Sequence, residues 1–341
     1  MRNWFLVVLL LVLLSVSSRV CWGKNERLFT EPNSELLFAW DYGNLLVSTP
    51  AGDIDVPGPA GPVGGGYFVI PALAPGGDLI AIGLTLSDHS DRTKCDPTVV
   101  TCALPGTAQK MSVMGVYSIR DKEWKTYGDF CMFGAGSAAF SPDGRKIAFE
   151  STMRSASQNC NAGYEQKSLL ILDLASGRFT QVPYTTGVIA NASISWSPDG
   201  KYIAIESAAR WGPNSIVLIE VGSWAQKTIA VGGNPSWSPK GDWIAYDTGQ
   251  GIASMIMHPD GTGSKMLLDA FGRFGAWDVD SGAVWSPDEK TILLNEREEG
   301  GRVELVSVDL DTGKVKIVSK RTPRVFGWVQ LASDQRPGAR Q

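Results

Sequence analysis

Three acidic residues occupy equivalent positions in a repeated segment of this chain, and they are its first candidates for chemistry. Glu150, Glu206 and Asp247 each stand at the same distance after the last residue of a short turn. In a fourth copy the position holds Asn295, followed by Glu296. A partly desolvated group of carboxylates concentrates cationic ligands. These positions therefore predict an acidic ring that binds positive groups of a partner.

Local ion pairing is the alternative interpretation of the same acids. The pair Glu150 and Arg154 recurs as Glu206 and Arg210. Internal pairs of this kind would neutralise the ring at little net gain in stability. Both interpretations stay open, and the candidate binding residues are Glu150, Arg154, Glu206, Arg210, Asp247 and Glu296.

The sequence contains few of the residues and motifs that are typical of catalytic sites. The chain has only two histidines, His89 in a polar loop and His258 in a hairpin turn, and both positions favour the surface. No Gly-x-Ser-x-Gly elbow is present, no Cys/His spacing suggests zinc, and no Gly-rich loop leads into a phosphate-binding helix. We predict no catalytic residue, no metal and no cofactor.

A repeated turn and strand must position the acids. The clearest copy is Phe140-Ser141-Pro142-Asp143-Gly144 before an apolar run, and related copies lie at 73–77, 196–200, 237–241 and 285–289. Serine can bond to the backbone, proline presets φ, and glycine supplies a positive φ, so each copy predicts a turn between antiparallel strands. Glu289 replaces the glycine, so that copy must strain its backbone or use a different turn.

The copies that contain Ser141, Ser197, Ser238 and Ser286 recur at spacings of 56, 41 and 48 residues, close to the length of one propeller blade. A second hairpin follows each turn, as at 169–174 with 179–182, so each unit predicts a four-stranded antiparallel meander. The end fragments are complementary: 324–329 supplies a lone first strand, and 36–56 supplies three more. The prediction is an all-β, six-bladed β-propeller of four-stranded antiparallel blades, closed by pairing N- and C-terminal strands. A solenoid or a pair of β-sandwiches is the alternative.

Tryptophan recurs where the first strand of a unit ends, at Trp196, Trp237, Trp285 and Trp328. Wedge-like packing between blades is the favoured interpretation, and a platform for stacking a ligand is the alternative.

The turn Trp196-Ser197-Pro198-Asp199-Gly200, followed by Ile203-Ala204-Ile205, resembles the TolB-like, WD40-like β-propeller repeat family. The segment 257–263 is similar to that family's second hairpin. The resemblance implies a propeller but no single function, because such propellers occur in periplasmic translocation proteins, secreted binders and the gating domains of peptidases. We expect a propeller without the α/β domain that TolB and the peptidases add.

Residues 1–23 combine an early cation, an apolar run and small residues, which predicts a signal peptide. An uncleaved anchor is the alternative, and only then would we expect a membrane association. The expected organisation is completed by a propeller over 24–332 and a disordered tail over 333–341. The net charge of −4 becomes more negative when Arg2 and Arg19 leave with the signal, so nucleic acid is not an expected partner.

Four cysteines remain after removal of the leader: Cys95, Cys102, Cys131 and Cys160. An even number in an exported chain predicts two disulfides, and we expect Cys95 to pair with Cys102 and Cys131 with Cys160. They belong to long insertions that should lie on the face opposite the Ser-Pro turns.

The function predicted from these features is that of an exported, non-enzymatic and monomeric propeller that binds a protein or peptide, in the periplasm or outside the cell. Binding is expected on the face that carries the insertions. The alternative is a propeller hydrolase or lyase that uses carboxylates and arginines of the channel.

Overall fold

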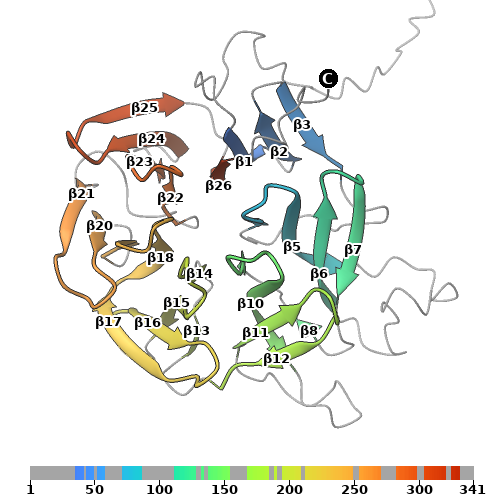
Figure 1. Ribbon diagram of the computed structural model, residues 1–341. Helices are drawn as coiled ribbons and strands as arrows, with labels where there is room; N and C mark the ends of the chain where they lie inside the picture. The colour runs from blue at the N-terminus through green and yellow to red at the C-terminus, as the bar shows by residue number, and fades with distance from the viewer. Residues whose placement is uncertain are drawn as a thin grey trace, which may run out of the picture. The chain divides into compact units, whose positions relative to one another are not determined.

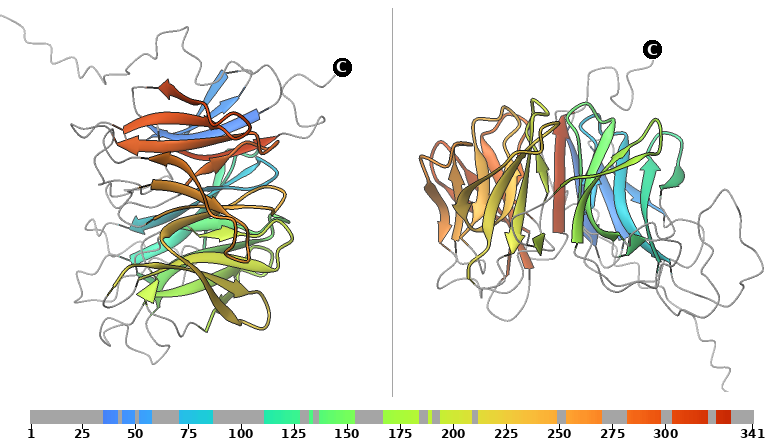
Figure 2. Two further views of the ribbon diagram at one scale, coloured as in Figure 1. Left: turned by 90° about the vertical axis from the view of Figure 1, so that its left-hand side faces the viewer. Right: turned by 90° about the horizontal axis from the view of Figure 1, so that it is seen from below.

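The computed structural model describes these parts of the chain: 35–41, 44–49, 52–57, 71–86, 111–127, 132–133, 137–153, 167–183, 188–189, 194–208, 212–248, 253–269, 282–297, 303–319 and 324–330. Every regular element in these ranges is a β-strand. Residues 31–341 form a compact unit by themselves. Within it the strands form sheets arranged around an axis (Figure 1), and they run from one face of the ring to the other (Figure 2).

Five blades consist of consecutive strands. The first contains β4 (Ala72–Leu73), β5 (Leu79–Leu86), β6 (Met111–Ser118) and β7 (Glu123–Tyr127). The second contains β8 (Met132–Phe133), β9 (Ala138–Phe140), β10 (Lys146–Met153), β11 (Lys167–Asp173) and β12 (Phe179–Gln181). The third contains β13 (Val188–Ile189), β14 (Ser195–Trp196), β15 (Tyr202–Ala208), β16 (Ser215–Glu220) and β17 (Gln226–Val231). The fourth contains β18 (Gly233–Trp237), β19 (Ile244–Asp247), β20 (Ala253–Met257) and β21 (Lys265–Asp269). The fifth contains β22 (Val284–Trp285), β23 (Thr291–Arg297), β24 (Val303–Asp309) and β25 (Val315–Ser319).

A further sheet joins the two ends of the described chain, and we call it the closing sheet. Its strands, in spatial order, are β26 (Arg324–Gln330), β1 (Glu35–Asp41), β2 (Asn44–Thr49) and β3 (Gly52–Val56). The antiparallel pairing of β26 with β1 includes Glu35 opposite Gln330 and Leu37 opposite Trp328. The predicted pairing of the N- and C-terminal strands is therefore confirmed.

The predicted number of six blades is corrected to five. Each of the five is a run of consecutive strands, and in each of them a turn of the repeat joins the innermost strand to the second. The prediction counted the closing sheet as a sixth equal unit, although no turn links β26 to β1. The all-β class and the antiparallel order of the blades are as predicted, but the innermost strand is divided in the second and third blades. There β8 and β9 both pair with β10, and β13 and β14 both pair with β15.

Apolar side chains from adjacent sheets form the core. One cluster joins Leu169 and Ile171 of the second blade to Trp196 and Ile203 of the third. Comparable clusters join the third blade to the fourth, the fourth to the fifth, the first to the second, and the closing sheet to the first. Strands covered on both sides are apolar on both sides. This is why the sequence shows short apolar runs rather than strict alternation.

Candidate functional site

A cavity of about 530 Å³ lies where the innermost strands meet the turns of the repeat. Its volume is in the range usual for ligand pockets. Innermost strands of all five blades and of the closing sheet contribute to the wall. The lining residues are Pro71, Ala72, Leu73, Pro75, Ala138, Ala139, Phe140, Pro142, Ile194, Ser195, Trp196, Pro198, Pro235, Ser236, Trp237, Ser238, Pro239, Gly282, Ala283, Val284, Pro287, Phe326, Trp328 and Val329.

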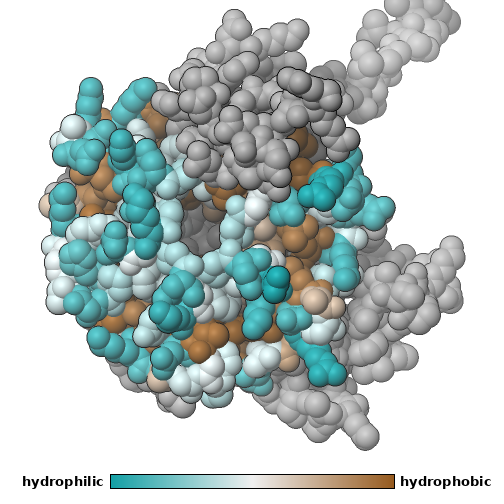
Figure 3. All heavy atoms as spheres, in the orientation of Figure 1, coloured by the Kyte–Doolittle hydropathy of each residue, from teal (hydrophilic) through white to brown (hydrophobic). Residues whose placement is uncertain are grey.

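The rim of the cavity is built by the five turns of the repeat, and we call this end of the ring the Ser-Pro face. The proline of every turn lines the cavity: Pro75, Pro142, Pro198, Pro239 and Pro287. Seen along the axis, the molecule is hollowed near the centre of the ring (Figure 3). The turn motif is therefore part of the cavity wall. Binding was predicted for the opposite face, whose insertions lie mostly outside the described residues.

Buried serine hydroxyls hold the turns. Ser197 is 2% exposed, accepts a hydrogen bond from the backbone N–H of Tyr202 at 2.9 Å, and donates to the Asp199 carboxylate at 2.7 Å. The same carboxylate accepts from the backbone N–H of Lys201 at 3.0 Å. The hydrogen bond from Ser197 is the main reason that the pKa of Asp199 is lowered to about 2. Ser141, Ser238 and Ser286 likewise accept a backbone N–H five residues on, so local hydrogen bonds of a buried serine hold four of the five turns at the rim.

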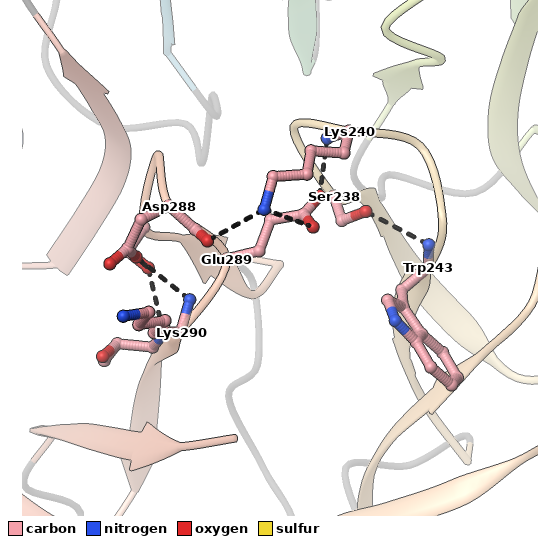
Figure 4. A network of polar contacts seen from close by, with 8 residues as sticks. Ser238, Lys240, Trp243, Asp288, Glu289 and Lys290 are labelled. Atoms are coloured by element: carbon pink, nitrogen blue, oxygen red, sulfur yellow. Dashed lines mark hydrogen bonds and ion pairs between the residues drawn. The ribbon is translucent and has the colours of Figure 1, made fainter. Parts of the chain in front are cut away.

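Two departures from the turn motif contact each other across neighbouring blades. Glu289 keeps the turn of the other copies, with φ 63° and a hydrogen bond from its N–H to the carbonyl of Ser286 at 2.9 Å. Of the two outcomes expected from the sequence, the strained backbone is the one observed. The Glu289 carboxylate accepts the backbone N–H of Lys240 at 2.5 Å and lies 3.5 Å from the Lys240 ammonium (Figure 4). Lys240 stands where three of the other turns have aspartate, so the residue that departs from the motif in one turn contacts the residue that departs from it in the next.

Among the described residues that line the cavity, no side chain could serve as an acid, a base or a thiol nucleophile. It consists of proline, aromatic, aliphatic, glycine and serine residues. Acid–base chemistry needs a titratable group within hydrogen-bonding reach of the reacting atoms. The described wall is suited to bind an uncharged surface.

Three of the four recurring tryptophans, Trp196, Trp237 and Trp328, form part of this wall, and Trp196 and Trp285 also pack between blades. Trp196 donates its Nε1–H to the carbonyl of Ala139, and Trp285 donates to the carbonyl of Ser236, both at 3.1 Å and both on the preceding blade. Trp196 and Trp285 are 8% and 5% exposed. The prediction of wedge-like packing is confirmed for these two residues. Trp237 and Trp328 are half-buried and line the cavity.

Two of the predicted acids lie together, but they are buried. Asn234, at the start of β18, donates its side-chain amide to Asp247 at 2.7 Å and its backbone N–H to Glu206 at 3.0 Å. Glu206 also accepts from the amide of Asn214. Glu206 and Asp247 are 8% and 7% exposed. Burial is the main cause that raises the pKa of Glu206, and the charge of Asp247 raises it further, against the hydrogen bonds from Asn234 and Asn214.

Glycine allows the backbone to approach this pair closely. A Cβ at Gly233 would lie 2.3 Å from the Glu206 carboxylate, and one at Gly232 would lie 2.2 Å from the carbonyl of Asp247. Gly232 also has φ 148°, which disfavours other residues. A sequence signal was therefore present in Gly232-Gly233-Asn234, where the innermost strand of the fourth blade begins.

The remaining predicted site residues are only partly described. Glu150 is 2% exposed, and it lies at the same position of β10 as Glu206 of β15. Glu296 lies on β23, where the structure describes only the backbone. Arg154 and Arg210, the four cysteines Cys95, Cys102, Cys131 and Cys160, and His89 lie outside the described residues. Binding by the acidic ring and the two disulfides stay predictions.

His258 is exposed, as predicted, and its ring stacks on Trp243 with 4.1 Å between the ring centroids. Among the described residues, no three side chains of histidine, cysteine, aspartate or glutamate are grouped so that they could hold a metal ion. The described residues also include no helix that is long and apolar enough to cross a membrane.

Comparison with solved structures identifies the fold. TolB from Acinetobacter baumannii superimposes with a TM-score of 0.61 at 16% identity, over 87% of this chain and 66% of that chain. A putative TolB from Agrobacterium tumefaciens gives a TM-score of 0.56 at 14% identity, over 84% of this chain and 88% of that one. This chain has a TolB-like β-propeller fold. No protein-family model and no curated protein matches its sequence.

The TolB-like propeller is also similar to a chain of a nidogen–laminin complex, with a TM-score of 0.58 at 11% identity, over 87% of this chain and 98% of that one. At these identities the likeness is one of fold. The chain spans slightly less than two thirds of the Acinetobacter TolB chain.

Proposed function

We propose that this chain is an exported binding propeller that holds a segment of a partner protein in the cavity of its Ser-Pro face. The observation that carries the proposal is the composition of the cavity wall, whose described residues are largely aromatic, aliphatic and proline and include no charged side chain. Removing apolar surface from water drives association, and aromatic residues in well-packed pockets provide much of the energy at protein interfaces. The signal-like residues 1–23 support export.

The structural neighbours are consistent with this proposal. One of them is a chain in a complex of nidogen with laminin, so a propeller of similar shape is found with a protein partner. The alternative function, a hydrolase or lyase, requires carboxylates and arginines in the channel. The described lining contains neither, and the buried pair Glu206 and Asp247 is held by asparagine side chains.

The proposal is tested by selecting binding peptides from a phage-displayed library of random linear peptides against the propeller without its leader. Selected peptides are synthesised and titrated by calorimetry against the wild type and two variants. Pro142→Glu adds a carboxylate at a half-buried residue of the cavity rim. Val231→Glu adds the same charge to an outer strand, at a side chain that is 56% exposed, and serves as the matched control.

We expect selected peptides to bind the wild type and Val231→Glu equally, and to lose about tenfold or more in affinity for Pro142→Glu, since a charge buried without a partner is costly. Thermal unfolding of each variant shows that it is folded. Equal affinity of the peptides for all three proteins would show that they bind outside the cavity. A selection that yields no binding peptide would reject the proposed function.

A further inference from the structure

Trp237 differs from the two other tryptophans that occupy the same position in their blades. The indole N–H of Trp196 and that of Trp285 each donate to a carbonyl of the preceding blade. The indole N–H of Trp237 is buried and bonds to none of the described residues. A buried donor without an acceptor destabilises the protein, and its presence in a native structure calls for an explanation.

The position of Trp237 suggests that explanation. Its half-buried ring lines the cavity beside Ser195, Ser236 and Pro235. The hydroxyl oxygen of Ser195 accepts the backbone N–H of Trp237 at 2.9 Å, so its own O–H remains a donor. Two acceptors of the wall, the carbonyls of Ala139 and Ser236, are already used by Trp196 and Trp285. This part of the wall therefore offers a ligand the O–H of Ser195 as a donor and, if its ring turns, the N–H of Trp237, whereas two of its carbonyl acceptors are already used.

A ligand that suits this wall has no charge, brings backbone carbonyls as acceptors, and brings few N–H groups that would be left without a partner. A proline-rich segment has these properties, because proline lacks the backbone N–H and keeps its carbonyl. Proline-rich segments are also preformed in an extended conformation, and they dock into grooves lined by aromatic residues. Phe140, Trp196, Phe326 and Trp328 provide such residues here.

We infer that the cavity binds an uncharged, proline-rich segment of a partner protein, and that the Trp237 ring turns on binding so that its N–H donates to a backbone carbonyl of that segment. The inference rests on the proposed function of the cavity and names its ligand class. Trp237 would be the residue that selects for the carbonyl, whereas Trp196 and Trp285 keep their bonds between blades.

The inference is tested with capped peptides that carry no terminal charge. The probe is acetyl-Pro-Pro-Leu-Pro-Pro-amide, and its comparators replace the four prolines by alanine or the leucine by lysine. Each is titrated against the wild type, Trp237→Phe and Trp285→Phe. Phenylalanine keeps an aromatic ring and removes the N–H. Trp285 has the same position in its blade and does not line the cavity, so its variant is the matched control.

We expect the proline peptide to bind the wild type about tenfold more tightly than either comparator. Trp237→Phe should weaken its binding by about tenfold, the effect of one hydrogen bond to a buried donor, and Trp285→Phe should leave it unchanged. With 5-fluorotryptophan incorporated, the ¹⁹F resonance that Trp237→Phe removes should shift on addition of the peptide.

Equal binding of the proline and alanine peptides, or unchanged binding to Trp237→Phe, would overturn the inference. If peptides from the phage selection still require an unaltered rim in that case, the cavity remains the binding site and only the ligand class is wrong. Absence of binding by all three capped peptides would likewise reject the proline-rich class, and the selection experiment then decides separately whether the cavity binds peptides at all.

Discussion

Lys240 and Glu289 should stabilise the propeller only as a pair, and this can be measured with a double-mutant cycle. Glu289→Gly restores the common turn residue at φ 63°. Removing a non-glycine residue from this left-handed conformation should stabilise the folded state by about 1 kcal/mol. The greater freedom of glycine in the unfolded chain costs about 0.5 to 1 kcal/mol. These two effects nearly cancel.

The contacts between Glu289 and Lys240 therefore decide whether Glu289→Gly raises or lowers the free energy of unfolding. Glu289→Gly removes the hydrogen bond from the backbone N–H of Lys240 to a carboxylate that is 10% exposed, worth about 1.5 kcal/mol. The ion pair adds a few tenths of a kcal/mol at most, because the Lys240 side chain is 61% exposed. We therefore expect Glu289→Gly to lower the free energy of unfolding by about 1.5 kcal/mol, despite removing a strained residue.

The second arm of the cycle is Lys240→Asp, which restores the other common turn residue. With Glu289 present, the new carboxylate stands beside a carboxylate. In the Glu289→Gly background, it can accept from Ser238 and from the backbone as Asp199 does in its own turn. We expect the two substitutions to be coupled by about 1 to 2 kcal/mol, with the double variant more stable than Glu289→Gly alone.

Urea unfolding followed by tryptophan fluorescence measures all four corners of this cycle. The midpoints can be compared if the dependence on urea concentration is the same for all four proteins. A stabilising effect of Glu289→Gly would show that backbone strain outweighs the bridge. Strictly additive effects of the two substitutions would show that the contacts in Figure 4 do not couple the fourth and fifth blades.

Three further predictions concern the turns and the buried acids. Ser197→Ala should lower the free energy of unfolding by about 1 to 2 kcal/mol, because the backbone N–H of Tyr202 loses its acceptor; urea unfolding that matches the wild type would contradict this role. Gly233→Ala should cost about 3 kcal/mol or more, since its Cβ would meet the Glu206 carboxylate. Gly313→Ala is the comparison: it has open space for a Cβ but a positive φ of 69°, which Gly233 lacks, so it measures backbone strain without a clash and should cost only about 1 kcal/mol. Because the pKa of Glu206 is raised in the folded protein, it contributes stability that is present below pH 4.5, the ordinary pKa, and is lost as the pH rises through the folded-state value. The stability of the wild type relative to Glu206→Gln should thus fall as the pH rises above 4.5, and an increase in stability over that range would refute the assignment.

The repeat made much of the fold predictable. Ser197, Pro198, Asp199 and Gly200 form a turn through hydrogen bonds among close neighbours, so their identities suffice to predict it. Strands in the regular hairpins followed from the apolar runs between such turns. The number of blades was less predictable, because a strand pattern does not distinguish a blade of consecutive strands from a sheet that both chain ends share.

The candidate site depended on contacts that are distant in sequence. The equivalent positions of Glu206 and Asp247 in their repeats predicted an acidic ring, but their burial and their bonds to Asn234 depend on how the third and fourth blades pack. Acidic residues at the same position of three repeats predict an exposed ring when the covering backbone at Gly233 is unknown.

The sequence by itself determined the turns and strands, because these arise from hydrogen bonds and φ preferences of residues that are neighbours in the chain. The cavity and the contacts between blades were decided by the tertiary structure alone. It brought five prolines from separate turns around one cavity, placed Glu289 against Lys240, and left the N–H of Trp237 without the acceptor that Trp196 and Trp285 have. Those outcomes depend on the offset between neighbouring blades, which is set by the packing of side chains from both and is encoded in neither one alone.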